Sequence, residues 1–315
     1  MPDLSPKNRT ITRTLPRDHV GRERVAIALA VTIPLLGTAA AATLAWGGSL
    51  HPWDIASLLT MYAMTVAGTS IGYHRFFTHR SFKTSRPVKI GLGILGSMAV
   101  QGPVLDWVST HRRHHEVADL PEDPHTPHRG DLHATGSSFR GLLYAHIGWM
   151  FSDQEGANPH RYIPDLLTDR DARWLHRTFP VWAAAGLALP AGVGLTFTGT
   201  WEGAMSGFLW GGLVRVFLLQ HATFSVNSIC HSFGARTFRT PDASRNVRWL
   251  WLVTFGESWH NNHHAFPNSA RFGVRSGEPD PGGLVISVLE RLGLIWDVVT
   301  ISPHRVSSRL TPPPR

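Results

Sequence analysis

Eight histidines fall into three clusters whose spacing is typical of metal ligands. The clusters are His74-Arg-Phe-Phe-Thr-His79, His111-Arg-Arg-His114-His115 and His260-Asn-Asn-His263-His264. Residues three and four apart share one face of an α-helix, so each of the last two clusters can point three imidazoles toward one side. His74 and His79 are five residues apart and diverge on an ideal α-helix, so we expect a helix end or a turn between them.

A fourth element, Asn227-Ser-Ile-Cys-His231, brings the candidate ligands to nine imidazoles. Nine are too many for one metal ion and suit two. Neutral imidazole binds zinc, copper, iron and nickel, so the ligand type alone does not identify the metal. The single cysteine, Cys230, excludes an intrachain disulfide and metal sites built from cysteine. The alternative is a set of ordinary surface histidines, which two H-x-x-H-H patterns in one chain disfavour.

The elements that must position these clusters are long apolar segments. Residues 25–46 form a stretch of 22 residues without a charge, enough for roughly 33 Å of helix, about the thickness of a bilayer core. Three further candidate spans cover residues 55–73, 181–200 and 204–224, so the spans come as two tight hairpins. A cleaved signal peptide is the alternative for the first span, and the second span close behind it disfavours that interpretation.

Two features of the apolar segments do not fit a simple membrane span. Residues 88–100 are apolar but number only 13, which predicts an interfacial or buried helix. Arg215 lies late in the fourth span, where a charge facing lipid would be costly. We therefore expect Arg215 to face the protein interior or the cytosolic interface.

Arginine is distributed unevenly along the chain. Both hairpin tips lack lysine and arginine, whereas the N-terminal tail and residues 74–180 and 225–315 are rich in arginine. The positive-inside rule places these three parts, with every histidine cluster, on the cytosolic side. We expect residues 1–24 to be a disordered basic tail, residues 25–305 to form one membrane domain and residues 306–315 to be a loose tail.

The formal net charge of +8 is compatible with anionic lipid headgroups, with phosphate-bearing substrates or with nucleic acid. The sequence holds no zinc-finger spacing, no RNA-binding aromatic signature and no basic helix with heptads. Together with the long apolar runs, this argues against nucleic-acid binding and for the lipid bilayer as a partner.

The three histidine clusters resemble, in order and placement, the H-x-x-x-x-H, H-x-x-H-H and H-x-x-H-H boxes of the integral-membrane fatty acid desaturases, specifically the stearoyl-CoA-type Δ9 acyl desaturases. The resemblance covers roughly residues 25–300. It includes Trp107, Asp123-Pro124-His125, the segment from Gly141 to Trp149, and Gly256-Glu257-Ser258-Trp259 before the third box. The related membrane alkane hydroxylases use differently spaced boxes that contain Glu, so a di-iron lipid hydroxylase is the weaker alternative.

The resemblance implies an all-α integral membrane protein, in which four transmembrane helices lie under a cytosolic helical cap that holds a di-iron site. One iron would take His74, His79, His111, His115 and His263. The other would take His114, His231, His260 and His264, with Asn227 holding a water molecule. The implied reaction is oxygen-dependent desaturation of a long-chain fatty acyl group at Δ9, from saturated acyl-CoA to the cis-monounsaturated product.

The chemistry supports the same class of protein. Removing hydrogens from an unactivated methylene group needs an oxidant stronger than any side chain, so a redox metal pair must activate dioxygen, and zinc cannot. The alternative from another class is a non-enzymatic, histidine-rich zinc-binding membrane protein. Such a protein predicts a path of polar residues along the spans, which hold little of this kind apart from Arg215.

Two residues are candidates for orienting the metal ligands. Glu257 lies three residues before His260, and His125 lies close to the second cluster. A surface carboxylate is the alternative for Glu257, and an ordinary hydrogen-bonding histidine is the alternative for His125.

Two residues of the second span are candidates for the acyl tunnel. Tyr62 lies 12 residues before His74, about 18 Å deeper along a helix. It resembles the family position that closes the tunnel, and Val66 lies one turn nearer the irons. A lipid-facing or packing tyrosine is the alternative.

Several family positions that contact the CoA headgroup differ in this chain. They are Asp153-Gln154, Ser109-Thr110, Gly102 and Phe224. CoA is therefore expected as the acyl carrier by default, and acyl carrier protein thioesters and glycerolipid acyl chains stay open.

The electrons must come from another protein, because the chain has no dinucleotide-binding fingerprint and no cytochrome b5 heme-binding signature. A ferredoxin, a rubredoxin or a cytochrome b5 with its reductase is implied. The excess of arginine over lysine indicates a GC-rich bacterial genome. We therefore expect a multi-pass protein of a bacterial plasma membrane, with both termini and the active site in the cytosol.

Overall fold

The computed structural model describes residues 17–48, 50–128, 138–152 and 156–311. Within these ranges the regular structure is helical apart from one two-stranded sheet, which confirms the predicted all-α class. The parts of the predicted tails at residues 1–16 and 312–315 lie outside the described residues, as do Asp153 and Gln154.

Four helical segments of the described chain are long and apolar enough to cross a membrane, as predicted. They are Gly21–Trp46, Pro52–Thr78, Phe179–Thr198 and Trp201–Ser228. The largest difference from the predicted bounds is at the second segment, which ends at Thr78 rather than at residue 73. The second span therefore continues directly into the first histidine cluster.

Two of the spans change their helical type along their length. The first span belongs to α1 (Arg17–Trp46), and the second is α2 (Pro52–Ala67) followed without a break by the π-helix η1 (Gly68–Thr78). The third is α9 (Phe179–Thr198). The fourth runs through α10 (Trp201–Gly207), the π-helix η3 (Phe208–Val214) and α11 (Arg215–Ser228).

Part of each predicted tail is helical. Helix α1 begins at Arg17, so residues 17–24 are helical rather than disordered. Helix α14 (Pro303–Arg309) covers residues 306–309, which are therefore not loose. The Ser302 hydroxyl accepts a hydrogen bond from the Arg305 N–H at 3.4 Å and so caps the start of α14.

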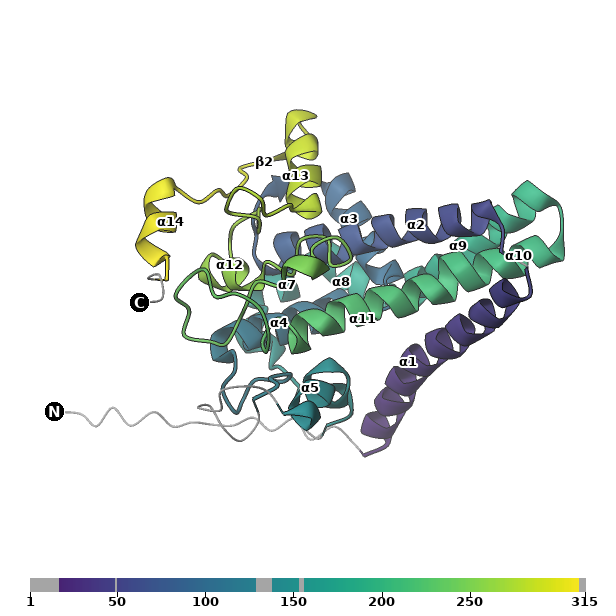
Figure 1. Cartoon of the computed structure of the whole chain (residues 1–315), viewed down its shortest axis with the longest axis horizontal. Coiled ribbons are helices and arrows are strands. Elements are labelled where there is room, and N and C mark those ends of the chain that lie inside the picture. Colours follow the sequence, from purple (N-terminus) through teal and green to yellow (C-terminus); the bar gives the residue numbers. More distant parts are fainter. Residues whose placement is uncertain (1–16, 49, 129–137, 153–155, 312–315) are drawn as a thin grey trace.

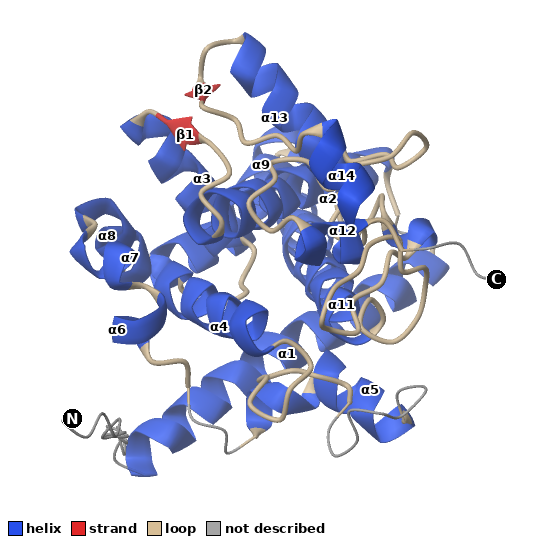
Figure 2. Ribbon diagram, turned by 90° about the vertical axis from the view of Figure 1, so that its left-hand side faces the viewer, coloured by secondary structure: helices blue, strands red, loops and turns tan. Residues whose placement is uncertain are grey.

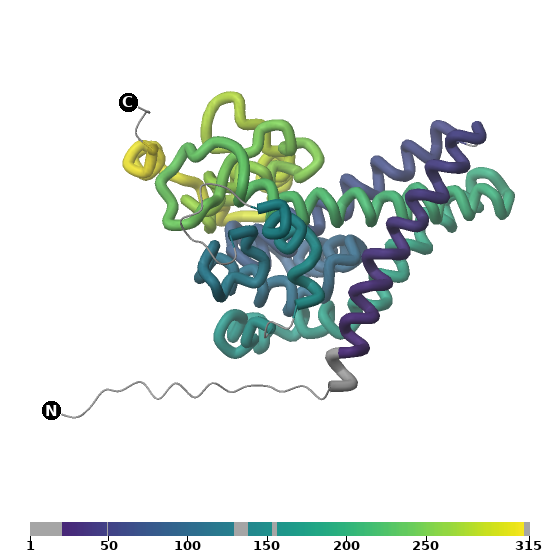
Figure 3. The backbone as a smooth tube through the Cα atoms, turned by 60° about the horizontal axis from the view of Figure 1, so that its bottom comes forward, coloured from purple at the N-terminus to yellow at the C-terminus, as the bar shows by residue number. Residues whose placement is uncertain are grey.

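The four spans form one bundle, with both hairpin connections at the same end. In Figure 1 the connections from α1 to α2 and from α9 to α10 lie at the right, and the other elements gather at the left. Figure 3 shows the same separation from another side. Helix α1 exposes Val25, Leu29, Ile33 and Leu36 along one face. Such an apolar face is suited to lipid rather than to water.

The cap, by which we mean residues 79–178 and 229–311, is built mainly from short helices (Figure 2). Its helices are α3 (Arg86–Met98), α4 (Val104–Val117), α5 (Phe139–His146), η2 (Gly148–Phe151), α6 (Pro159–Tyr162), α7 (Pro164–Thr168), α8 (Arg170–Arg177), η4 (Arg248–Leu250), α12 (His260–Ala265), α13 (Pro281–Arg291) and α14. The strands β1 (Lys83–Thr84) and β2 (Ile295–Trp296) pair in antiparallel register, with Lys83 opposite Trp296. This sheet joins the two parts of the cap.

Helix α3 is the short apolar segment predicted to be interfacial or buried, and it packs on η1 and α9. A Cβ at Gly68 would lie 2.3 Å from the backbone nitrogen of Gly96, so the two backbones approach closely because both residues lack a side chain. Arg215 is fully buried and donates to the carbonyls of Met98 at 2.6 Å and Gly186 at 2.7 Å. Arg215 therefore faces the protein interior and joins the fourth span to α3 and α9.

Candidate metal centre

The first two candidate ligands lie at the end of a π-helix. The His79 N–H donates to the His74 carbonyl at 3.2 Å, a hydrogen bond between residues five apart. This wider spiral places residues five apart on one side, and the two ring centroids are only 4.9 Å apart. His79 is also the C-terminal cap of η1. A helix end is therefore present as predicted, but the convergence of the two rings comes from the π-helix and not from a turn.

Helix α4 carries the second cluster, and Arg112 joins it to the end of η1. The Arg112 guanidinium donates to the carbonyls of Phe77 at 2.9 Å and Thr78 at 3.1 Å. These carbonyls belong to the last turn of η1, where helical partners run out. Arg112 also donates to both carboxylate oxygens of Asp165, at 2.6 and 3.1 Å. The histidines of the first two clusters are thereby held against each other.

Helix α12 carries the third cluster, and the two asparagines of that cluster fasten it to the surrounding loops. Asn261 Oδ1 accepts from the Phe238 N–H at 2.7 Å. Asn262 Nδ2 donates to the Phe272 carbonyl at 2.8 Å and to Glu278 at 2.7 Å. A helix of six residues is not stable alone, so these bonds hold its histidines in place. Neither asparagine is marked for this role by its position in the sequence.

Five imidazoles converge in what we call the first histidine group. It consists of His74, His79, His111, His115 and His263, and one ring nitrogen of each lies within 4.8 Å of the others. His263 Nε2 is 3.0 Å from His74 Nε2 and 2.8 Å from His115 Nε2. His115 Nε2 in turn is 3.0 Å from His111 Nε2. Ring nitrogens from η1, α4 and α12 therefore face one common point.

Four further imidazoles form the second histidine group. It consists of His114, His231, His260 and His264. His260 Nε2 lies 2.9 Å from His231 Nε2 and 3.1 Å from His264 Nε2. His264 Nε2 lies 3.3 Å from His114 Nε2. The structure thus brings together the same two sets of histidines that the resemblance implied for two irons.

Neighbouring histidines within one cluster belong to different groups. His115 belongs to the first group and His114 to the second, whereas His263 belongs to the first and His264 to the second. Consecutive residues of an α-helix point about 100° apart, whereas residues four apart nearly coincide. The rings of His115 and His264 stack at 4.5 Å between centroids, where the two groups meet. Each H-x-x-H-H cluster therefore supplies both groups instead of directing three imidazoles to one point.

Carboxylates contact the Nδ1 atoms of three of the four imidazoles of the second group. His114 Nδ1 contacts Asp123 at 3.0 Å, His231 Nδ1 contacts Asp119 at 2.8 Å, and His264 Nδ1 contacts Asp242 at 2.9 Å. A carboxylate on Nδ1 fixes the tautomer and turns Nε2 toward the metal in many protein metal sites. None of these aspartates was among the residues predicted to orient the metal ligands. Asp123 follows His114 by nine residues, which was a local signal for it, whereas Asp119 and Asp242 are 112 and 22 residues from their histidines and had none.

Glu257 contacts a different histidine from the one that its sequence position suggested. It lies three residues before His260, but its carboxylate accepts a hydrogen bond from His74 Nδ1. Because α12 begins only at His260, the residues before it do not continue that helical face. The fully buried Arg75 lies 3.5 Å from Glu257 and donates to Asp280 at 2.9 Å. Glu257 therefore supports the first group and not the second.

The other candidate for orienting a ligand, His125, lies beside the second group. Its ring is 4.4 Å from that of His114 between centroids, and its Nδ1 lies 3.8 Å from Asp123. The side chain is buried, and its Nδ1 has no hydrogen-bond partner among the described residues. Its contribution to ligand orientation stays a prediction.

A narrow cavity of about 50 Å³ borders the first group. Its lining includes Val66, Thr69, Ser70, His74, Trp107, His111, Leu219, Thr223, Asn227, Val253 and Glu257. Tyr62 packs against Val66, and its hydroxyl donates to the Val253 carbonyl at 2.5 Å. Both predicted tunnel residues are therefore at or beside the cavity, and Asn227 lies on its wall.

Burial and mutual contact keep most of these imidazoles neutral. Burial first, and then the neighbouring imidazoles, lower the pKa of His79, His111, His115, His260 and His263 well below its ordinary value. Burial also lowers the pKa of His264 to about 4, although Asp242 opposes the shift. For His231, burial acts to lower the pKa, but the adjacent Asp119 raises it to about 9.

The donor set fits two metal ions of the kind that imidazole binds. Nine ring nitrogens face two adjacent points, and most of the rings are neutral, as metal ligands must be. Nitrogen donors favour zinc, copper, iron or nickel over magnesium and calcium, which prefer oxygen.

Comparisons with known proteins find the same similarity along most of the chain. A family model described as fatty acid desaturase matches residues 48–274. The chain is 43% identical to the hex-5-enoyl-(acyl-carrier protein) acetylenase of Moorena producens (strain JHB), over 91% of this chain and 90% of that protein. It is 35% identical to Delta-9 acyl-lipid desaturase 1 of Arabidopsis thaliana, over 76% of this chain and 73% of the relative. It is 34% identical to the sn-1 stearoyl-lipid 9-desaturase of Anabaena variabilis, over 85% of this chain and 92% of that protein.

Proposed function

This chain belongs to the fatty acid desaturase family, and we propose that it desaturates a long-chain fatty acyl group at Δ9 in an oxygen-dependent reaction. The observation that carries the proposal is that the first histidine group forms one wall of a narrow cavity. In the balanced reaction, two adjacent CH₂ groups lose one hydrogen each and become CH=CH. One O₂, two electrons from a donor protein and two protons complete the formation of two waters.

We propose that the two metal ions are iron. The first histidine group would hold one and the second histidine group the other, with a water molecule on Asn227. Bound iron supplies the activation of dioxygen that no side chain can provide. The carboxylates of Asp119, Asp123, Asp242 and Glu257 hold the Nδ1 protons of their histidines, so that each Nε2 stays free for the metal.

The narrow cavity beside the first histidine group, which we call the acyl cavity, positions and shields the reacting part of the substrate. Its wall presents apolar side chains such as Val66, Leu219 and Trp107 to a hydrocarbon chain, and it reaches the first group at His74 and His111. These apolar side chains keep water from the reacting carbons and restrict the acyl chain to few positions. The carbons that react would be those beside His74 and His111.

Tyr62 is expected to limit the length of the acyl chain, because its hydroxyl is tied to the Val253 carbonyl beside the cavity. Replacing Tyr62 with alanine removes the ring and this bond and should shift the products toward longer chains. The measurement is the chain-length profile of the products formed from a mixture of acyl substrates. Met64→Ala, at an exposed position two residues further along α2, is the control and should leave the profile unchanged. An unchanged profile for Tyr62→Ala would count against this role.

The acyl carrier proposed first is CoA, as the sequence resemblance implied. The relatives compared above are named for an acyl-carrier-protein substrate and for lipid substrates, so both carriers are alternatives that an experiment must separate. Of the positions that depart from the CoA-contacting pattern, Ser109 is buried on α4, and its hydroxyl donates to the Ala157 carbonyl at 3.3 Å. Ser109 is thus engaged within the protein.

A second candidate function is the conversion of an existing double bond into a triple bond. The observation that favours it is the 43% identity to an acetylenase over nine tenths of both proteins. The chemistry is the same removal of two hydrogens from adjacent carbons, applied to CH=CH instead of CH₂–CH₂. The shape of the acyl chain that the cavity accepts, saturated or already unsaturated, would determine which of the two reactions takes place.

We also propose that the cap lies in the cytosol of a bacterium. Both hairpin connections lie at the end of the bundle away from the cap, and they lack lysine and arginine, whereas the cap is rich in arginine. The positive-inside rule then places the cap and both histidine groups on the cytosolic side.

The proposed function is tested by expressing the chain, with a reductase and a ferredoxin, in a bacterial host that makes no unsaturated fatty acid by an oxygen-dependent route. Fatty acids are separated by chromatography, and double or triple bonds are located by mass spectrometry. A new Δ9 cis bond supports desaturation, and a triple bond from a supplied alkenoic acid supports the second candidate. Assays of the purified protein with CoA, carrier-protein and lipid substrates identify the carrier. Zinc alone under iron-replete growth, with no new unsaturated product, would contradict both functions.

A further inference from the structure

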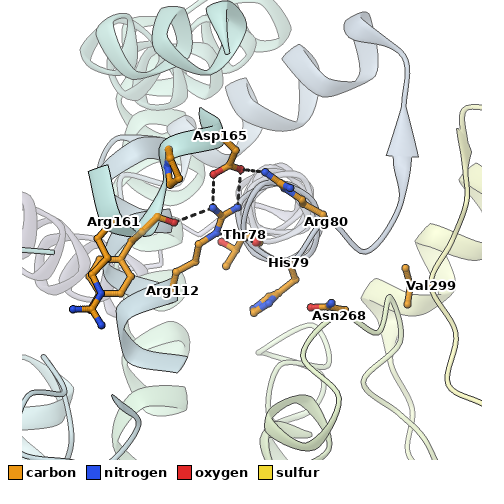
Figure 4. Close-up of a pocket in the computed structure, with 10 residues that line it drawn as sticks. Thr78, His79, Arg80, Arg112, Arg161, Asp165, Asn268 and Val299 are labelled. Carbon is orange, nitrogen blue, oxygen red and sulfur yellow. Dashed lines mark hydrogen bonds and ion pairs between the residues drawn. The ribbon is translucent and has the colours of Figure 1, made fainter. Parts of the chain in front are cut away.

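A second hollow contacts the first histidine group from a different side. This depression has a volume of about 490 Å³, and we call it the arginine depression (Figure 4). Its lining is Thr78, His79, Arg80, Arg112, Arg161, Tyr162, Pro164, Asp165, Asn268 and Val299. Among the described residues it shares none with the acyl cavity, which reaches the first group at His74 and His111.

His79 links the arginine depression to the first histidine group. Its side chain lines the depression, and one of its ring nitrogens is among the five that converge in the group. His79 Nε2 is buried and has no hydrogen-bond partner in the described part of the chain. His79 is 9% exposed, so a molecule in the depression would be separated from the metal of the first group by one imidazole.

The rim of the depression is positively charged. Its lining contains three arginines and one aspartate. Arg112 is committed to the backbone carbonyls of η1 and to Asp165, so it belongs to the framework. The side chains of Arg80 and Arg161 are 64% and 63% exposed. Arg80 shares Asp165 with Arg112, and Arg161 pairs with the exposed Glu116. The exposed Arg161–Glu116 pair is weak. Arg112 already neutralises Asp165, so Arg80 adds a positive charge at the rim, and both exposed guanidinium groups can bind an acidic group of another molecule.

The proposed reaction needs two electrons that the chain has no recognisable means of supplying itself. Resting on that proposed function, we propose that the arginine depression is the docking site of a small acidic one-electron carrier protein, with His79 as the entry for electrons into the first histidine group. Each docking event oxidises one reduced carrier, so two events supply the two electrons of one turnover. The two protons of the reaction come from water.

Charge and shape favour this occupant over the headgroup of the substrate. The acyl chain must lie in the acyl cavity, and its headgroup would leave from that cavity, whose described lining has no residue in common with the depression. Weak electron-transfer complexes use small interfaces and depend on electrostatic steering, for which a shallow basic hollow is sufficient. A positive rim beside a metal ligand matches a carrier whose cofactor is surrounded by acidic side chains.

The test measures electron transfer from a reduced acidic [2Fe–2S] ferredoxin to the iron-loaded protein in lipid nanodiscs, by stopped-flow absorbance and without acyl substrate. The variants are Arg80→Glu, Arg161→Glu and the double variant. The matched control is Arg140→Glu, at an exposed arginine of α5 outside the depression. We expect the second-order rate constant of electron transfer from ferredoxin to fall about 10-fold or more in the double variant at low salt. This rate constant should also depend less on salt in the double variant than in the wild type.

Two further measurements separate a docking defect from damage to the metal site. The iron content and the rate of reduction by dithionite should equal those of the wild type in all variants. Equal ferredoxin rates for the double variant and Arg140→Glu would overturn the inference. A raised KM for acyl-CoA with an unchanged ferredoxin rate would also overturn it, because the depression would then bind the headgroup. Since the ferredoxin step is followed without substrate, its outcome is independent of whether the proposed desaturation is correct.

Discussion

Replacing His263 with alanine is expected to lower desaturation by more than about 100-fold and to release metal from the first histidine group. His263 is fully buried, and its Nε2 lies within 3.0 Å of both His74 Nε2 and His115 Nε2. Loss of a residue that hydrogen-bonds to a metal ligand lowers metal affinity or activity about 10–100-fold, and loss of the ligand itself should lower them further. Iron per chain and product formation are the measurements.

The control for this prediction is His304→Ala, at an exposed histidine on α14 that belongs to neither group. It should leave iron content and activity at the wild-type level. Circular dichroism of both variants checks that the helices remain. If His263→Ala kept two irons per chain and full activity, the proposed two-metal centre would be wrong.

Replacing Asp119 with asparagine is expected to weaken metal binding in the second histidine group about 10–100-fold and to spare the first. Asp119 Oδ2 accepts from His231 Nδ1 at 2.8 Å and from the Ala243 N–H at 2.7 Å, and Oδ1 accepts from the Thr126 hydroxyl at 2.9 Å. Asparagine has one acceptor oxygen where aspartate has two, so one of these donors must lose its partner or face an NH₂ group. Asp119 has a φ of 62°, which asparagine tolerates, so the backbone should not change.

The substitution is expected to weaken metal binding, and not to strengthen it, because of its effect on His231. The Asp119 carboxylate accepts the Nδ1 proton and so directs Nε2 toward His260. Without that negative charge, the ring can rotate or change its tautomer, and its nitrogen becomes a weaker donor to a cation.

Iron titration followed by Mössbauer spectroscopy should show one tightly held iron in Asp119→Asn and two in the wild type. Asp297→Asn is the matched control, because Asp297 is exposed and pairs only with Lys83 among the described residues. Two equally tight irons in Asp119→Asn, or equal losses from both groups, would contradict the division of the histidines into two groups.

The membrane spans and the histidine clusters could be predicted because both are local patterns. The apolar run at residues 25–46 is long enough to cross a bilayer, and its length can be measured without knowing which segments it contacts in the fold. The boxes around His111 and His260 are marked by spacing within five residues. The helix of the second span continues to Thr78, beyond the predicted end of the span at residue 73, because the polar cluster that starts at His74 ends the apolar run but not the helix.

Three of the four carboxylates that contact the histidines could not be paired with them from the sequence, because they are distant in the chain. Asp242 is 22 residues from His264, Asp119 is 112 residues from His231, and Glu257 is 183 residues from His74. Glu257 was a candidate because it lies three residues before His260, but its partner is His74, because a turn separates Glu257 from α12.

The sequence by itself determined that this protein has four apolar spans and nine histidines at metal-ligand spacing, since helix periodicity and apolar length act over a few residues. Only the tertiary structure decided how those histidines divide. It directs His114 and His115 into different groups, and a π-helix brings the rings of His74 and His79 to one side although they are five residues apart. It also places a carboxylate in contact with the Nδ1 atom of four of the histidines. The reason is physical: a ligand set and its supporting charges are completed by residues that only packing brings within hydrogen-bond distance.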